Sequence, residues 1–344
     1  MVIDLISKIF GRSRILVPCQ GTALVVQASY QNAKRNLRDA LGEIGIGKMG
    51  GQGDRVLVNP NLCGPGDTQK YKEKNNSTHT SMEVLKAAVS LYLDCGIRPK
   101  DITIVGNPDP CGRTDFSYED YYRSTGVLEL TCQTGVRFES LANYGLGRDD
   151  LFAETQIESG SILKAARFAK VVSEHNLFLN LPIAKTHWRT RISAAYKNIM
   201  GIIDQRTRQR MHELGRSDRD LAQCILDLYQ GLPVPPQNIL HVVDAIVAQE
   251  GEGPRNGRDV RLGALIVGRD PLAVDLTAAA VMGFEAKEVD FLDLALQQKQ
   301  RASGHEVIGQ QLKAVCRRKF LVPIQKKVRG ECCAMKISSE ALKK

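Results

Sequence analysis

RVLVN at residues 55–59, TSMEVLKAAVSLYLDCG at residues 80–96 and ITIV at residues 102–105 are the segments that decide the fold. The first and last are short apolar runs, which are typical of buried strands. Between them, Thr80 and Glu83 have the spacing of a capping box, and Gly96 ends a helical repeat. The apolar positions of that repeat are Leu85, Ala88, Val89 and Tyr92. A strand, a helix and a strand in this order predict parallel pairing with a right-handed crossover.

The remaining periodicity extends this unit along the chain. We expect strands at residues 176–181, 239–243 and 262–267, and helices at residues 161–169, 191–203, 217–229 and 272–282. Asp270 followed by Pro271 is typical of a helix start. The prediction is an α/β fold with a mostly parallel sheet, helices on both faces and an irregular insertion at 106–160. We divide the chain into an extension with an amphipathic helix (1–54), an α/β domain (55–305) and a basic helix and tail (306–344).

Composition narrows the class of protein. The 344 residues are 43% hydrophobic and 25% charged, enough apolar material for a sizeable core. The sequence has no run of about 20 apolar residues, and residues 1–14 lack a secretion signal, so we expect a cytoplasmic protein without a transmembrane segment. A net charge of +9 favours anionic partners. Aromatic residues make up only 6% and no nucleic-acid-binding motif is present, which argues against nucleic acid.

The candidate site follows from the rule that ligands of open α/β sheets bind outside the carboxyl ends of the strands. One loop there offers Asn59 and Asn61, with His79 and Thr80 further on, and plain turn chemistry explains it equally well. A second offers a lysine and a histidine directly after a strand, with a lysine and an amide in the next helix. These four residues are Lys185, His187, Lys197 and Asn198. Together they predict an anion site with a group able to move a proton.

Acidic and glycine-rich segments complete the candidate set. Asp244 precedes a loop with Glu250, Gly251 and Gly253, and the glycines permit close backbone approach. We predict that Lys185, His187 and Glu250 are catalytic and that the remaining loop residues bind ligand, with Asp270 among them. A divalent metal stays open as a cofactor, with His187, Asp244 and Glu250 as candidate ligands.

Two further features allow two interpretations each. The carboxylate of Asp275 lies in an apolar helix and either bonds a helix terminus or faces the site. His212, after Arg206, Arg208 and Arg210, belongs either to a phosphate clamp or to a solvated basic loop, and the second is favoured.

Five segments in a fixed order resemble the domain-of-unknown-function family 362. They are VNPNL (58–62), NLPIAKTH (180–187), YKNIMG (196–201), the stretch from DAI to EGEGP (244–254) and GRDPLAVD (268–275), within roughly residues 55–285. The resemblance implies a fold and motif residues but no reaction. It also implies an association with iron–sulfur modules. This chain departs from the family there, because its nine cysteines contain no C-x-x-C run for a [4Fe–4S] cluster, and Asn59 replaces a lysine common in the family.

Two classes of function remain. The first is an enzyme or binder of a small anionic metabolite, in which Lys185 and Lys197 hold the anion and His187 serves as acid or base. The second is an iron–sulfur-associated redox accessory protein that works with a redox partner. Whether the protein is an enzyme is left open.

Overall fold

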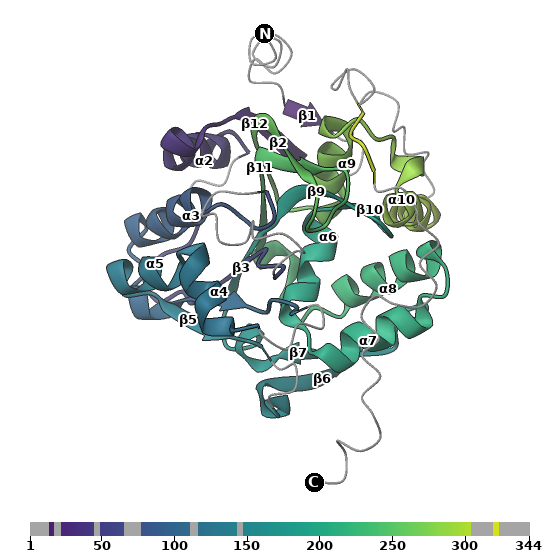
Figure 1. The fold of residues 1–344 in the computed structure, drawn as a ribbon, viewed down its shortest axis with the longest axis horizontal. Helices are drawn as coiled ribbons and strands as arrows, with labels where there is room; N and C mark the ends of the chain where they lie inside the picture. The colour runs from purple at the N-terminus through teal and green to yellow at the C-terminus, as the bar shows by residue number, and fades with distance from the viewer. Residues whose placement is uncertain are drawn as a thin grey trace.

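One sheet organises the part of the chain that the computed structural model describes, which is residues 14–16, 22–44, 49–64, 77–110, 116–142, 147–303 and 319–322. Its strand order is β1-β2-β12-β11-β8-β3-β4-β5, and β9 and β10 join it beside β11 (Figure 1). The α/β prediction is confirmed, and the sheet is mixed rather than purely parallel.

The parallel part of the sheet contains the predicted strand–helix–strand unit. Strands β3 (Val56–Pro60), β4 (Ile102–Gly106), β5 (Arg137–Ser140), β8 (Leu177–Leu181) and β11 (Ile239–Glu250) run in one direction. Helix α3 (Met82–Asp94) connects β3 to β4. Ser81 caps α3 by accepting a hydrogen bond from the Glu83 N–H at 3.2 Å, so the capping box expected at Thr80 is wrong by one residue.

The antiparallel part is a hairpin extended by the N-terminal segment. β11 pairs antiparallel with β12 (Arg258–Gly268), which pairs antiparallel with β2 (Thr22–Gln27), and β1 (Arg14–Leu16) follows. In this register His241 lies opposite Gly268, so β12 ends where β11 begins. The segment after β12 therefore emerges at the amino edge of the parallel strands, opposite the edge where β3 ends.

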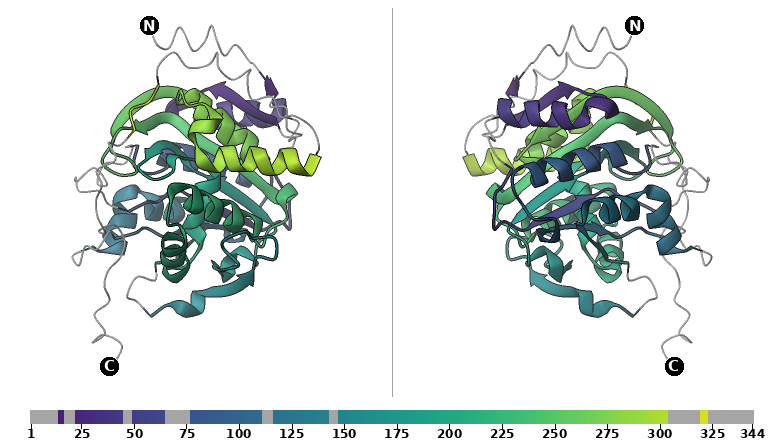
Figure 2. Two further views of the ribbon diagram at one scale, coloured as in Figure 1. Left: turned by 90° about the vertical axis from the view of Figure 1, so that its right-hand side faces the viewer. Right: turned by 90° about the vertical axis from the view of Figure 1, so that its left-hand side faces the viewer.

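Helices cover both faces of the sheet, as predicted (Figures 1 and 2). One face packs against α2 (Ala33–Glu43), α3, α4 (Tyr118–Thr125) and α5 (Val127–Thr134). The other packs against α6 (Ala195–Asn198), α7 (Gln205–Leu214), α8 (Asp218–Gln230), α9 (Pro271–Val281) and α10 (Asp290–Ser303). Adjacent strand residues point to opposite faces, so Leu57 joins one apolar core while Val56 and Val58 join the other.

Two segments expected to be helical are strands instead. β7 (Ala165–Ala169) pairs antiparallel with β6 (Phe152–Gln156), and β10 (Arg191–Ser193) pairs antiparallel with β9 (Ile183–His187). In both cases small or β-branched residues alternate over too few positions to separate a period of 2 from one of 3.6. The helix expected from residue 191 begins at Ala195.

The domain boundaries stay predictions. β2 and α2, from the proposed extension, belong to the main sheet and its helical cover, and β5, from the proposed insertion, extends the sheet. The amphipathic helix expected near the start lies outside the described residues, as does most of 306–344. Among the residues that the structure describes, no helix is long and apolar enough to cross a membrane.

Candidate functional site

The carboxyl edge of the parallel strands brings together the three loops predicted to form the site, and Asp270 lies elsewhere. The end of β3 leads to Asn61, β9 carries Lys185 and His187, and the loop after Glu250 packs against β9. That packing is direct: the Thr186 hydroxyl donates to the Gly251 carbonyl at 3.1 Å, and a Cβ at Gly253 would collide with the Thr186 carbonyl. Gly253 therefore allows close approach to the neighbouring strand.

Lys185 lies at the centre of this edge and is only 1% exposed. Its ammonium donates to Asn61 Oδ1 at 2.9 Å and to the Thr78 carbonyl at 2.9 Å. Burial lowers the pKa of Lys185, and the Cys63 thiol opposes that shift. A buried cation is stable only with such partners, so Lys185 fixes the geometry of the edge as well as supplying charge.

A network of hydrogen-bonded asparagine side chains holds Asn61, the partner of Lys185, in place. Asn61 Nδ2 donates to Asn198 Oδ1 at 3.0 Å, and Asn198 Nδ2 donates to the Asn59 carbonyl at 3.0 Å and to Asn180 Oδ1 at 2.7 Å. Asn59 Nδ2 returns a bond to the Asn198 carbonyl at 3.0 Å. Asn59 and Asn198, predicted as ligand-binding residues, are buried and engaged with one another, so their visible role is to join β3, β8 and α6.

The ring of His187 is held in one tautomer. Its Nδ1 accepts hydrogen bonds from the backbone N–H groups of Arg189 at 3.2 Å and Thr190 at 3.3 Å. Burial lowers the pKa of His187 well below its ordinary value, and the cations of Lys197 and Lys185 lower it further. The neutral ring with an accepting Nδ1 must carry its proton on Nε2. His187 is thus built to donate a hydrogen bond.

Other cations gather around this histidine. Burial, together with the charge of Lys185, lowers the pKa of Lys197 to about 8. Within the described part of the chain, the Lys197 ammonium has one polar contact, the Met200 sulfur at 3.8 Å. Arg255 donates to the Cys63 carbonyl at 3.1 Å and lies 3.4 Å from the carboxylate of Asp109.

His212 and Arg208 belong to the same cluster. Burial lowers the pKa of His212 to about 4, with Lys197 and Arg189 contributing, and its Nδ1 lies 3.3 Å from an Arg189 guanidinium nitrogen. Arg208 donates to the Met200 carbonyl at 3.0 Å and to the Asn107 carbonyl at 3.2 Å. The segment is helix α7 rather than a loop, and it packs Arg208 and His212 against the site, whereas Arg206 and Arg210 are exposed as the solvated interpretation expected.

Cys63 was not predicted as a site residue. Burial raises the pKa of its thiol, but the cations of Lys185 and Arg255 outweigh burial, so the pKa lies below its ordinary value. Its Sγ also lies 3.9 Å from the Pro254 carbonyl oxygen. The only sequence signal for Cys63 is its place two residues after Asn61 in a strand-exit loop, and Arg255 had only its place in a glycine-rich turn.

The carboxylates predicted to lie in the site, Glu250 and Asp244, accept hydrogen bonds from backbone N–H groups, and Glu250 also pairs with an arginine. Glu250 Oε1 accepts from Arg258 at 2.8 Å and Glu250 Oε2 accepts from the Leu321 N–H at 3.0 Å. Asp244 accepts from the N–H groups of Ser81 and Ile246 at 3.0 and 3.1 Å, and burial raises its pKa to about 6. Across the described ranges, no three His, Cys, Asp or Glu side chains are grouped to hold a metal ion. His187, Asp244 and Glu250 are thus not brought together as a metal site.

The remaining predicted residues lie beside or away from the cluster. Thr80 donates to the Leu181 carbonyl at 2.6 Å, and the His79 Nδ1 lies 3.0 Å from the Thr80 carbonyl, so both hold the segment that carries Thr78. Asp270 caps α9 through the Leu272 N–H at 2.9 Å and lies at the opposite edge of the sheet. Asp275 accepts from the Ala195 N–H at 2.6 Å, which confirms that it bonds a helix terminus.

A comparison with protein families identifies the family that this sequence matches. The model described as domain of unknown function DUF362 matches residues 56–280, which confirms the resemblance seen in the sequence. A thylakoid-associated protein of Synechocystis sp. is 24% identical over 249 residues, 72% of this chain and 68% of that protein.

Two solved structures are also similar. A protein from Thermotoga maritima has a TM-score of 0.44 at 11% identity, covering 73% of this chain and 60% of that one. The lactate racemase apoprotein from Thermoanaerobacterium thermosaccharolyticum has a TM-score of 0.42 at 12% identity, covering 74% of this chain and 55% of that one. This chain therefore spans less than two thirds of either solved chain.

Proposed function

This chain belongs to the family described as domain of unknown function DUF362, and because that description names no reaction, we propose a function from its residues: it binds a small dianionic metabolite. The ligand class is a phosphate ester or a dicarboxylate. The ammonium of Lys197, the guanidinium of Arg255 and the Nε2–H of His187 contact the anion, and Lys185 supports them from the buried edge.

The observation that carries this proposal is the imbalance of charge around His187. Lys197, Lys185 and Arg255 each lower its pKa, and of these three cations Arg255 faces a carboxylate, Asp109 at 3.4 Å, while the two lysines bond only to neutral groups in the described residues. Gathering like charges in a half-buried space costs free energy unless a counterion joins them. A dianion removes that cost, and the positive potential draws it in.

The hydrogen-bonding capacity of the cluster fits the same ligand. Ammonium and guanidinium groups only donate, and the neutral His187 donates through Nε2. An ionised phosphate or carboxylate oxygen accepts hydrogen bonds, so each of these donors finds a partner on the anion. The acid or base role first expected of His187 becomes a positioning and donating role in this proposal.

Calorimetry with inorganic phosphate and with malonate tests the proposal. We expect binding of at least one of them, with uptake of a proton fraction near pH 8, because the anion raises the pKa of Lys197 from about 8. Replacing Lys197 by Met should weaken binding, whereas replacing the exposed Lys100 by Met should leave it unchanged. Equal affinity in the wild type and the Lys197→Met variant contradicts the proposal.

The redox accessory role is the alternative. An anaerobic preparation that carries iron, together with an absence of phosphate or malonate binding, would favour it over the anion site.

A further inference from the structure

The indole of Trp188 lies beside the cationic cluster, on the turn between β9 and β10. Trp188 is 42% exposed, and it is the only aromatic residue among the exposed large hydrophobic side chains of the described ranges. A tryptophan ring offers a large apolar face, and tryptophan is enriched among the residues that carry binding energy. An exposed indole directly after His187 therefore indicates a contact with whatever His187 binds.

The protein holds this indole in a fixed orientation. His187 Nδ1 accepts hydrogen bonds from the backbone of the turn, which fixes the turn itself. The Arg189 guanidinium lies 5.8 Å from the centre of the Trp188 ring. That guanidinium is anchored in turn, because it donates to the Asp218 carboxylate at 2.9 Å and to the Gly215 carbonyl at 2.7 Å. An exposed ring on such a support loses little conformational freedom when a ligand covers it.

The imidazole of His187 and the indole of Trp188 are nearly parallel, with an interplanar angle of 16° and centroids 6.2 Å apart. The Nε2–H bond of His187 lies in the imidazole plane, so an anion that accepts it lies close to that plane. A flat ring joined to this anion can therefore lie parallel to the indole while the anion keeps its hydrogen bond. Offset parallel rings attract one another at such separations.

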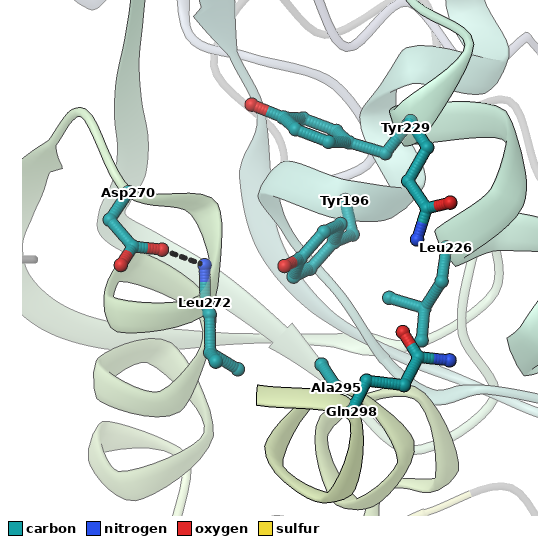
Figure 3. A pocket seen from close by; sticks show the side chains of 8 residues that line it. Tyr196, Leu226, Tyr229, Asp270, Leu272, Ala295 and Gln298 are labelled. Carbon is teal, nitrogen blue, oxygen red and sulfur yellow. Dashed lines mark hydrogen bonds between the residues drawn. The ribbon is translucent and has the colours of Figure 1, made fainter. Parts of the chain in front are cut away.

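A second aromatic surface adjoins the cationic cluster, but its rings already pack against the protein. It is a cavity of about 180 Å³ lined by Tyr196 and Tyr229, and Tyr196 directly precedes Lys197 on α6 (Figure 3). The two tyrosine rings meet edge to face with centroids 5.0 Å apart, and the Tyr196 ring meets Phe291 in the same way at 6.0 Å. The Trp188 indole is therefore the better stacking surface for a ligand.

We propose that the anion bound at this site carries a planar aromatic ring, which stacks on the indole of Trp188. This inference rests on the proposed function and narrows the ligand to a phosphate ester that contains such a ring. The ring is joined to the phosphate either directly, as in an aryl phosphate, or through a sugar, as in a nucleotide. Such a ligand matches both features at once, because the phosphate pairs with Lys197 and Arg255 while the ring covers the apolar indole.

Calorimetry of the full chain compares ligands that share the phosphate and differ in the ring. Phenyl phosphate is paired with ethyl phosphate, and adenosine 5′-monophosphate is paired with ribose 5-phosphate. Stacking on an aromatic side chain strengthens binding about tenfold, so we expect at least one ring-bearing ligand to bind about tenfold more tightly than its partner. Equal affinities within both pairs overturn this inference and leave the anion site standing. If none of the four ligands binds, both the inference and the proposed function are wrong.

Fluorescence tests the contact directly, because Trp188 is the single tryptophan of the chain. The ring-bearing ligand should quench the indole emission along the same binding curve that calorimetry gives. Its partner without the ring should change the emission less at saturation, since it brings no ring to the indole. Binding of a ring-bearing ligand that changes the emission no more than its partner does contradicts the inference.

Variants at Trp188 separate the ring from the fold. Trp188→Leu keeps an apolar side chain without a ring, so the ratio of the two affinities within a pair should fall to about one. Trp188→Phe keeps a ring and should retain most of the ratio. Val322→Ala, at another exposed apolar side chain, is the control and should keep the wild-type ratio. A wild-type ratio in Trp188→Leu, or a ratio of one in Trp188→Phe, refutes the assignment.

Discussion

Replacing Lys197 by Met tests whether the buried charge of Lys197 lowers the free energy of unfolding when no anion is bound to the proposed site. The pKa of Lys197 falls from 10.5 to about 8 mainly because the ammonium is buried beside Lys185. At about 1.4 kcal/mol per pKa unit, the charged form costs the native state up to about 3 kcal/mol at pH 7. Methionine has a similar length and no charge, so the variant should be more stable than the wild type and its Tm should rise by several degrees.

The effect of the Lys197→Met replacement on stability should depend on pH. Between pH 8 and 10.5 the unfolded state holds a proton on Lys197 that the native state has lost, so wild-type stability rises with pH in that window. The advantage of Lys197→Met should therefore be full at pH 7 and disappear near pH 10.5. Denaturant unfolding at several pH values measures it, with Lys100→Met as the exposed control.

Adding the anion should largely offset the difference in stability between the wild type and the Lys197→Met variant. A dianion at 100 times its Kd should stabilise the wild type by about 2.7 kcal/mol and the variant by much less. A Lys197→Met variant that is less stable than the wild type at pH 7, or equal stabilisation of both proteins by phosphate and malonate, would contradict this prediction.

The remaining predictions concern three side chains at the same edge. His187→Asn keeps an acceptor for the two backbone N–H groups but loses the Nε2–H, so anion affinity should fall about tenfold. Because the pKa of His187 is lowered well below its ordinary value, ¹⁵N NMR of the wild type should show the neutral Nε2–H form at pH 6, and a protonated ring at that pH would contradict it. Glu250→Gln weakens the contacts to Arg258 and Leu321 and should cost about 1–2 kcal/mol of stability without changing anion affinity. A large loss of affinity in calorimetry would show instead that Glu250 takes part in anion binding. Cys63 should react with iodoacetamide faster at pH 7 than the exposed Cys132, because its pKa is lowered, and bound anion should slow it; equal rates, measured by mass spectrometry, would refute this.

Much of the fold follows from local pattern. The apolar runs at residues 55–59 and 102–105 and the helix between them were predicted because three signals agree there, namely run length, helical period and a terminating glycine. Asp270 before Pro271 likewise predicted the start of α9. The direction of β12 was not predictable, since an apolar run of its length is the same in a parallel and an antiparallel strand.

The antiparallel direction of β12 also explains why Asp270 was wrongly predicted to lie in the site. The rule for carboxyl ends places Asp270 beside Lys185 only if β12 runs parallel to its neighbours, and it does not. Lys185 and the glycine-rich turn were correctly brought together because both follow parallel strands. Cys63 and Arg255 were missed because an isolated cysteine or arginine in a turn carries no periodicity, and its meaning depends on neighbours distant in sequence.

The pairing of Glu250 and Gly251 with Leu321 links the end of the chain to its middle. The Gly251 N–H donates to the Leu321 carbonyl at 2.7 Å, and Phe320, from the same short segment, is buried in the core. Because these hydrogen bonds join the two segments, we expect the turn that carries Arg255 to open together with residues 319–322. If the proposed anion site is correct, we expect a molecule that binds residues 319–322 to change the affinity for the anion, and by thermodynamic reciprocity a bound anion to change the affinity for that molecule.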